Sequence, residues 1–177
     1  ENRVAGRILH LLSGPINGSS LHHGRSCMAD KLGERVGSSL LTIVDDPTIP
    51  RGLGSTPWDG DLMVARPRTI VREGVLESFY LSTYYARKLG VAPTTGGSTN
   101  WVVPPGTRAW PTIAADWDKA ILVTGFLGGN ANGLTGDFSF GIRGRLLERG
   151  VPTASLAEMN VSGNVLTIFH QLAEVGN

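Results

Sequence analysis

The sequence predicts an α+β domain with a mixed, largely antiparallel sheet, several short helices and long glycine-rich loops. Helical and strand-like segments follow one another without strict βαβ alternation, which argues against a doubly wound parallel sheet. Hydrophobic residues make up 41% and charged residues 18% of the chain, as in ordinary globular domains. The 24 glycines among 177 residues are about twice the average share and indicate many tight turns.

The helices are expected from apolar periodicity and from capping residues. Val4, Ile8 and Leu11 recur on one helical face, and Ser26 and Ser82 are typical N-caps. Helices are therefore predicted at residues 3–12, 26–32, 83–89, 112–119 and 165–173.

Short runs of β-branched and other apolar residues predict the strands. They are expected at residues 40–44, 69–71, 75–81, 100–103, 121–124 and 138–147. Two long loops separate them: residues 47–62, which interleave Pro and Gly with Leu53 and Trp58, and a glycine-rich loop at residues 128–136. Long loops inside compact domains are often functional.

Charge and cysteine content exclude several classes of function. With 16 basic and 15 acidic residues the formal charge is +1, and no basic run suggests a dedicated nucleic-acid surface. Cys27 is the single cysteine, which excludes an internal disulfide and favours a small buried hydrophobe. No apolar run approaches the ~18 residues of a membrane span. We expect the chain to be cytoplasmic. Because it lacks an initiator Met, we also expect it to be a fragment or a processed product.

No catalytic or metal-binding motif follows from the residue types. The histidines His10, His22, His23 and His170 lack the i, i+4 spacing with an adjacent glutamate that a helical zinc site needs. Surface or packing roles are favoured for them. The glycine-rich loops match no phosphate-binding pattern.

The first loop contains two carboxylates that are close in sequence. Asp59 and Asp61 straddle Gly60, a spacing that permits cation binding, but Asx-turn hydrogen bonding is the plainer interpretation. Ser55 lies outside any G-x-S-x-G pattern. The residues alone therefore predict no reaction.

Several motifs in order carry a family resemblance. They are Asp46-Pro47, residues 52–61 (GLGSTPWDGD), residues 71–76 (VREGVL), residues 82–90 (STYYARKLG), residues 122–124 with 133–139 (GLTGDFS), residues 162–164 (SGN) and residues 175–177 (VGN). Over nearly the whole chain this pattern resembles the TldD/PmbA family, also described as modulators of DNA gyrase. The segments at 82–90 and 133–139 are similar to its PmbA/TldE branch, whereas residues 95–100 and 148–155 depart from the family pattern.

The resemblance implies that residues 1–177 are the C-terminal domain of a PmbA/TldE-type member, truncated at both ends. The family's metal motif, H-E-x-x-x-H, belongs to the TldD branch, so this chain is expected to hold no metal and no catalytic residue, and its own enzymatic status stays open. Zinc is expected in a TldD-like partner of a heterodimer, or the chain pairs with itself. The complex would cleave or mature unfolded or extended peptides, with no direct contact to nucleic acid or membrane.

The resemblance and the glycine content together suggest substrate-binding or interface loops. Glycine lets two backbones approach closely, and an extended peptide can be held by hydrogen bonds to a strand edge. The candidate residues are Gly54, Ser55, Asp59 and Asp61 in the first loop and Thr135, Gly136 and Asp137 in the second. The alternative is a purely structural or regulatory binding module, including modulation of gyrase, with no part in proteolysis.

Overall fold

The computed structural model describes all 177 residues and contains two antiparallel sheets. The helices are α1 (Asn2–Leu9), the 3-10 helix η1 (His10–Leu12), α2 (Gly18–His22), α3 (Thr83–Leu89), α4 (Trp110–Ala115) and α5 (Val165–His170). The strands are β1 (Ile43–Asp45), β2 (Arg68–Arg72), β3 (Val75–Leu76), β4 (Trp101–Val102), β5 (Lys119–Ala131), β6 (Asp137–Glu148) and β7 (Val151–Asn164). This arrangement confirms the predicted α+β class.

The smaller sheet has the order β3-β2-β1-β4 and carries the main hydrophobic core. Ile43, Ile70 and Leu76 are fully buried in it. Leu12, at the end of η1, and Phe169 of α5 belong to the same cluster. Complete burial of each such side chain contributes about 1.5–3 kcal/mol, so this cluster fixes η1 and α5 against the small sheet.

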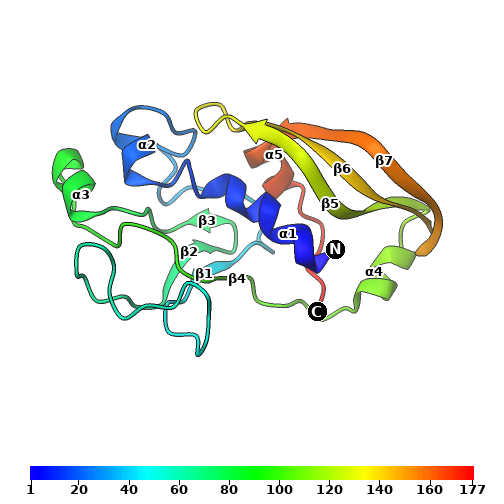
Figure 1. Cartoon of the computed structure of the whole chain (residues 1–177), viewed down its shortest axis with the longest axis horizontal. Coiled ribbons are helices and arrows are strands. Elements are labelled where there is room, and N and C mark those ends of the chain that lie inside the picture. The colour runs from blue at the N-terminus through cyan, green and yellow to red at the C-terminus, as the bar shows by residue number, and fades with distance from the viewer.

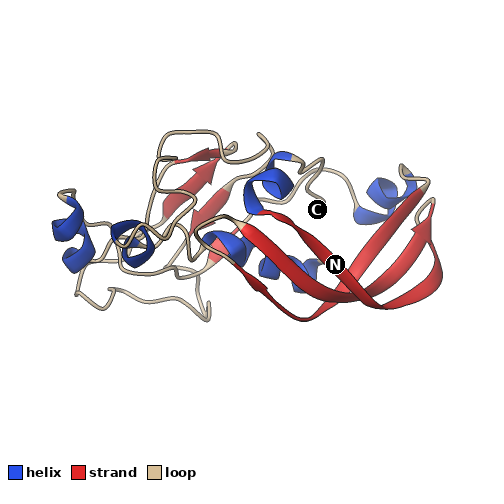
Figure 2. Ribbon diagram, turned by 90° about the horizontal axis from the view of Figure 1, so that it is seen from above, coloured by secondary structure: helices blue, strands red, loops and turns tan.

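The larger sheet has the order β5-β6-β7, with β5 and β7 at its edges. The middle strand buries alternate residues, among them Phe138, Phe140 and Ile142, as a strand with one covered face should. The three long strands curve together on one side of the molecule, and the small sheet with most of the loops lies on the other (Figure 2). Helix α1 runs beside β5 (Figure 1).

The helix predicted at residues 83–89 is found as predicted, whereas the second strand of the preceding hairpin, predicted at 75–81, ends at Leu76. Strands β2 and β3 join through Glu73 and Gly74, whose φ angles are +46° and +82°, as in a two-residue type I′ turn. The N–H of Tyr85 donates to the Ser82 hydroxyl at 3.4 Å, and Gly90 ends α3 with a φ of +71°. Capping chemistry read from the sequence therefore placed this helix correctly.

The predicted helix at residues 26–32 is wrong. The Ser26 hydroxyl donates to the Pro15 carbonyl at 2.6 Å and accepts from the Met28 N–H at 2.9 Å, which holds a tight turn in place of a helix. The helix lies earlier, because the Asn17 side chain accepts from the Ser19 N–H at 2.9 Å and caps α2. The Asn17-Gly18 pair thus begins a helix that is not among those predicted.

The glycine-rich loop is shorter than predicted, two helices end earlier than predicted, and one strand was not predicted. Strand β5 continues through Gly128 and Gly129 to Ala131, because an irregularity in its pairing with β6 accommodates their φ angles of +107° and +119°. The loop is thus confined to residues 132–136. Helix α4 ends at Ala115, α5 ends at His170, and residues 151–164 form an unpredicted strand whose partner is β6.

Candidate functional site

The first predicted loop is held by carboxylates that bind its own backbone. Oδ1 of Asp59 accepts from the N–H groups of Asp61 and Met63 at 2.9 and 3.0 Å, and its Oδ2 accepts from Gly96 at 3.0 Å. Oδ2 of Asp61 accepts from the Thr83 N–H and hydroxyl at 2.7 and 2.9 Å. Both carboxylates are therefore engaged in joining this loop to its neighbours.

Gly54 and Ser55 are engaged in the same way. The Gly54 N–H donates to Oδ1 of Asn100 at 2.9 Å, and the Asn100 amide donates to the Ser55 hydroxyl at 2.9 Å. A Cβ at Gly54 would meet the Thr99 carbonyl, so glycine is required there by close packing. These contacts hold the loop in place, and the bond from the Asp61 N–H to Oδ1 of Asp59 is the one that the Asx-turn interpretation predicts.

The Asp59 bonds make stability depend on pH. Partial burial raises the pKa of this carboxyl. The hydrogen bonds from the N–H groups of Gly96, Met63 and Asp61 together lower the pKa by more than burial raises it, so the net shift is downward. The ionised form therefore stabilises the fold above its unfolded pKa of about 3.9, and that contribution is lost as pH falls through the lower folded-state pKa.

We expect Asp59→Asn to flatten the acid side of the stability profile. We would measure the free energy of unfolding in urea at pH 6 and at pH 3. Between these two pH values the free energy of unfolding should fall by more in the wild-type protein than in the variant. Asp118→Asn, at an exposed carboxyl paired with Arg149, is the control and should follow the wild type. Equal losses in all three proteins would contradict the assignment.

The second predicted loop is fixed to the start of α5. The Asn164 amide donates to the Thr135 carbonyl at 2.8 Å and to Oδ1 of Asp137 at 2.9 Å. Hydrogen bonds from the Asn164 and Thr135 side chains lower the pKa of Asp137. Gly136 has a φ of +82°, and a Cβ there would meet Val165 at 3.0 Å. The two predicted loops lie in separate parts of the molecule (Figure 1).

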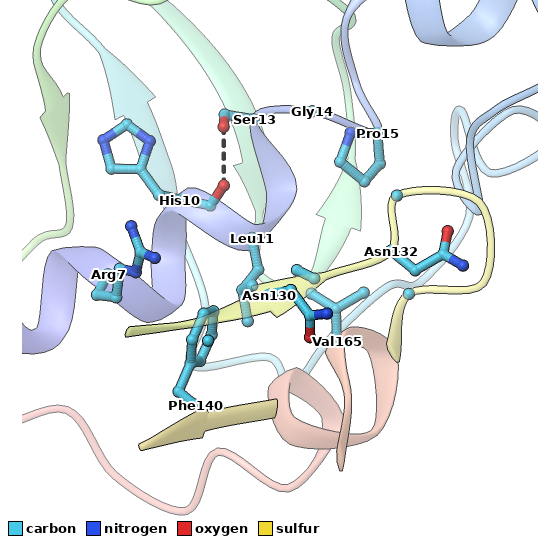
Figure 3. Close-up of a pocket in the computed structure, with 14 residues that line it drawn as sticks. Arg7, His10, Leu11, Ser13, Gly14, Pro15, Asn130, Asn132, Phe140 and Val165 are labelled. Carbon is cyan, nitrogen blue, oxygen red and sulfur yellow. Dashed lines mark hydrogen bonds between the residues drawn. The ribbon is translucent and has the colours of Figure 1, made fainter. Parts of the chain in front are cut away.

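A groove of about 470 Å³ lies between η1 and the end of β5 (Figure 3). Its volume is that of a small-ligand site. Its 14 lining residues are Arg7, His10, Leu11, Ser13, Gly14, Pro15, Gly129, Asn130, Ala131, Asn132, Gly133, Gly136, Phe140 and Val165. Gly136 is the one predicted site residue among them.

Side chains on opposite sides of the groove have distinct chemistry. Leu11 extends from η1 toward β5, where Asn130 lies (Figure 3). The Arg7 guanidinium lies 4.9 Å from the centre of the Phe140 ring. The His10 ring stacks on Trp101 with a centroid distance of 5.8 Å. None of the lining residues is Asp or Glu, so the fixed side-chain charge of the groove is positive.

The backbone of β5 adds hydrogen-bonding capacity to this groove. Strand β5 is an edge strand, and the Asn132 N–H donates to the Asp137 carbonyl at 2.8 Å. Because successive residues of an antiparallel ladder point their backbone groups to opposite sides, the N–H and C=O of Ala131 point away from β6. The groove is therefore flanked by strand-edge groups that another strand can pair with.

The chain offers no set of ligands that fits a catalytic metal. No group of three His, Cys, Asp or Glu side chains is close enough to hold an ion, whereas catalytic zinc takes three protein ligands. The rings of His22 and His23 lie edge to face, 5.0 Å apart, beside Tyr85. Cys27 is partly buried against the core, and burial raises its thiol pKa.

Comparison with known proteins decides the family. Residues 1–177 match the model of the PmbA/TldA metallopeptidase C-terminal domain. The chain belongs to the PmbA/TldD family. The metalloprotease PmbA of Escherichia coli O157:H7 is 30% identical over 99% of this chain, which covers 40% of that protein. A metalloprotease TldD homolog of Haemophilus influenzae is 26% identical over 86% of the chain and 34% of its own length.

Solved structures of similar proteins share this fold. A candidate modulator of DNA gyrase from Bacteroides thetaiotaomicron has a TM-score of 0.92 and 40% identity, over 97% of this chain and 39% of its own. TldE from Thermococcus kodakarensis has a TM-score of 0.85 and 27% identity, over 98% and 42%. The chain thus spans about two fifths of these proteins. No helix of the chain combines the length and apolar character that crossing a membrane requires.

Sequence reasoning missed most residues of the groove. Arg7 and His10 lie on a helix predicted correctly, but nothing local shows that they face residues 129–133 more than a hundred positions later. The one feature of the sequence that indicates the groove is the glycine density of residues 128–136. It indicates the correct segment, but it predicts a loop along the whole of it. Its first part is the open edge of β5.

Proposed function

We propose that this chain is the C-terminal domain of a PmbA/TldE-type subunit and helps to hold extended peptides in a metalloprotease complex whose zinc is bound by a TldD-like partner. Membership of the metallopeptidase family supports the link to proteolysis, and this chain groups no three His, Cys, Asp or Glu side chains around a possible ion. The observation that carries the proposal is the open edge of β5 beside the groove.

A strand edge suits substrates of varied sequence. An extended peptide that pairs with an edge strand is recognised through its backbone, which is the same for every sequence. The outward N–H and C=O of Ala131 supply such pairing at the groove. In this proposal the loops at residues 52–61 and 132–137 hold the surrounding structure, and Gly136 forms part of the groove wall.

A zinc ion held by the partner would supply the polarisation of the scissile carbonyl. The residues of this chain take no part in that step. They orient the peptide and hold its backbone, which converts a mobile substrate into a positioned one.

Blocking the edge should impair cleavage. Ala131→Pro removes an outward N–H while leaving the bonds between β5 and β6, and proline is tolerated on strand edges for that reason. We expect kcat/KM for an unstructured peptide to fall at least about 10-fold. A backbone hydrogen bond between the peptide and the strand contributes about 1 kcal/mol, and the proline ring also obstructs the approach of the peptide to the strand edge. The assay uses the full-length protein with its metal-bearing partner.

Ala131→Thr is the matched control, because it enlarges the side chain and keeps the N–H; it should retain activity within about threefold. Native mass spectrometry of each complex must show the same subunits and one zinc. Full activity of the proline variant in an intact complex would contradict peptide pairing at this edge. A complex without a zinc-bearing partner would contradict the proteolytic role.

A regulatory binding function is the second candidate, because the similar structure from Bacteroides thetaiotaomicron is described as a candidate modulator of DNA gyrase. The formal charge of +1 provides no excess of cations for duplex binding. Supercoiling assays with purified gyrase distinguish the two: an effect that survives removal of the metal-bearing partner would favour regulation.

A further inference from the structure

Arg7 is a cation without an anionic partner at the groove. Its guanidinium is positioned over Phe140 at 4.9 Å, but it takes part in no salt bridge. On the same helix Arg3 pairs with Glu1, and elsewhere Arg68, Arg72, Arg108 and Arg149 each have a carboxylate within 4.0 Å. The donors of Arg7 are therefore available to a ligand.

The surroundings of Arg7 favour an anion. The groove is also lined by the His10 ring, the amides of Asn130 and Asn132 and the Ser13 hydroxyl, and it contains no carboxylate. The contact of the Arg7 guanidinium with the Phe140 ring, 4.9 Å from its centre, helps to hold the cation beside the groove. The guanidinium itself is a planar fork of donors. A planar fork of this kind matches a carboxylate with two parallel hydrogen bonds.

The position of this cation links it to the open strand edge. Arg7 comes from α1, whereas Ala131 belongs to β5, and both line the same groove. A peptide paired with the edge at Ala131 therefore passes within the space that Arg7 also borders. Its backbone supplies the pairing, and a carboxylate on the same peptide supplies the charge that the groove lacks.

We propose that the groove between η1 and β5 is a subsite for a carboxylate group of the bound extended peptide, with Arg7 as the residue that recognises it. This rests on the proposed peptide-binding function and adds a preference to it: peptides with a carboxylate at this position bind better than neutral ones. The carboxylate comes either from the C-terminus of the peptide or from an Asp or Glu side chain.

The test measures peptide binding to the full-length protein in its complex by fluorescence anisotropy. The probes are fluorescein-labelled hexapeptides of Ala and Val in three forms: a free C-terminus, an amidated C-terminus, and an amidated C-terminus with one Glu. We compare wild type, Arg7→Gln and Arg7→Lys. Arg3→Gln, on an exposed part of the same helix, is the matched control.

For the wild type and Arg3→Gln we expect at least one carboxylate-bearing probe to bind about 10-fold more tightly than the neutral probe, or about 1.4 kcal/mol. Arg7→Gln should reduce this ratio to below about twofold, mainly by weakening the binding of the carboxylate-bearing probe. Arg7→Lys should give an intermediate ratio, because it keeps the charge and loses the fork. The probe that responds identifies the source of the carboxylate.

Equal affinities of all three probes for the wild type would overturn the subsite and leave the peptide-binding function intact. The same follows if Arg7→Gln and Arg3→Gln keep the same ratio. If no probe binds the wild-type complex, the proposed function fails together with the subsite. A Tm of Arg7→Gln within a few degrees of wild type shows that the change acts on binding rather than on folding.

Discussion

Replacement of Gly74 by alanine is expected to lower the free energy of unfolding by about 3 kcal/mol, through two separate causes. Its φ of +82° costs an L-residue roughly 1–2 kcal/mol. The added Cβ would also collide with the carbonyl oxygens of Gly37 and Ser38, and overpacking of this kind costs about 1–3 kcal/mol. These carbonyls are backbone atoms, so the collision cannot be relieved by turning a side chain.

The surrounding hydrogen bonds make the position more sensitive. The Gly74 N–H donates to the Leu41 carbonyl at 2.8 Å, and its own carbonyl accepts from Val36 at 2.7 Å. A shift of the turn therefore disturbs the segment that packs on β2 and β3. For a domain of this size we expect Tm to fall by about 6–12 °C, at 2–4 °C per kcal/mol.

Gly90→Ala separates the two causes. Gly90 has a similar φ of +71°, but a Cβ there meets nothing within 4 Å. Its replacement should cost about 1 kcal/mol from the backbone alone. Calorimetry of both variants checks the argument, and equal losses would show that the collision at Gly74 is absorbed by movement of the 37–38 backbone.

Local chemistry in the sequence predicted those elements whose signals are local. The Ser82 cap, the left-handed Gly90 and the Glu73-Gly74 turn each act within a few residues, and all three appear where the sequence predicts them. The helix at 26–32 failed because Ser26 bonds to Pro15, eleven positions earlier. Ser26 does form hydrogen bonds, as a capping residue should, but its partners are the Pro15 carbonyl and the Met28 N–H of a turn and not the first turn of a helix.

Long-range pairing limits what the sequence predicts of the larger sheet and the groove. Strand β7 contains Ala, Asn, Pro, Glu and Gly at seven of its 14 positions. These types are depleted in strands, so the pairing of β7 with β6 determines its conformation. The groove exists because α1 packs beside β5. Its components, Arg7 and residues 129–133, are ordinary in their own segments and acquire their chemistry from being brought together.

Loss of the buried carboxylate of Asp45 should be the most destabilising polar change in the chain. Its side chain is 3% exposed. Oδ1 accepts from the Thr99 N–H at 2.8 Å and the Thr99 hydroxyl at 2.6 Å. Oδ2 lies 4.0 Å from Nη2 of Arg68, whose guanidinium lies 4.4 Å from the centre of the Tyr80 ring. One carboxylate thus joins β1, β2 and the loop before β4.

We expect Asp45→Ala to lower the free energy of unfolding by about 3–5 kcal/mol, as measured by urea unfolding. The change leaves a largely buried Arg68 without its anion, and removing one member of a buried pair costs about this much. It also leaves the Thr99 donors unpaired, at about 1–3 kcal/mol when they are buried, although water entering the new space offsets part of both costs.

Asp45→Asn distinguishes charge from hydrogen bonding. The amide oxygen keeps an acceptor for Thr99 and removes the charge opposite Arg68, so we expect a loss of about half that of the alanine variant. If both substitutions cost the same, Arg68 is the dominant partner. If the asparagine variant is as stable as wild type, the hydrogen bonds to Thr99 carry the effect. If Asp45→Ala lowers the free energy of unfolding by less than about 1 kcal/mol, neither the charge nor the hydrogen bonds of Asp45 contribute as proposed. The contacts of Arg68 with Tyr80 and Thr95 would then be sufficient to satisfy it.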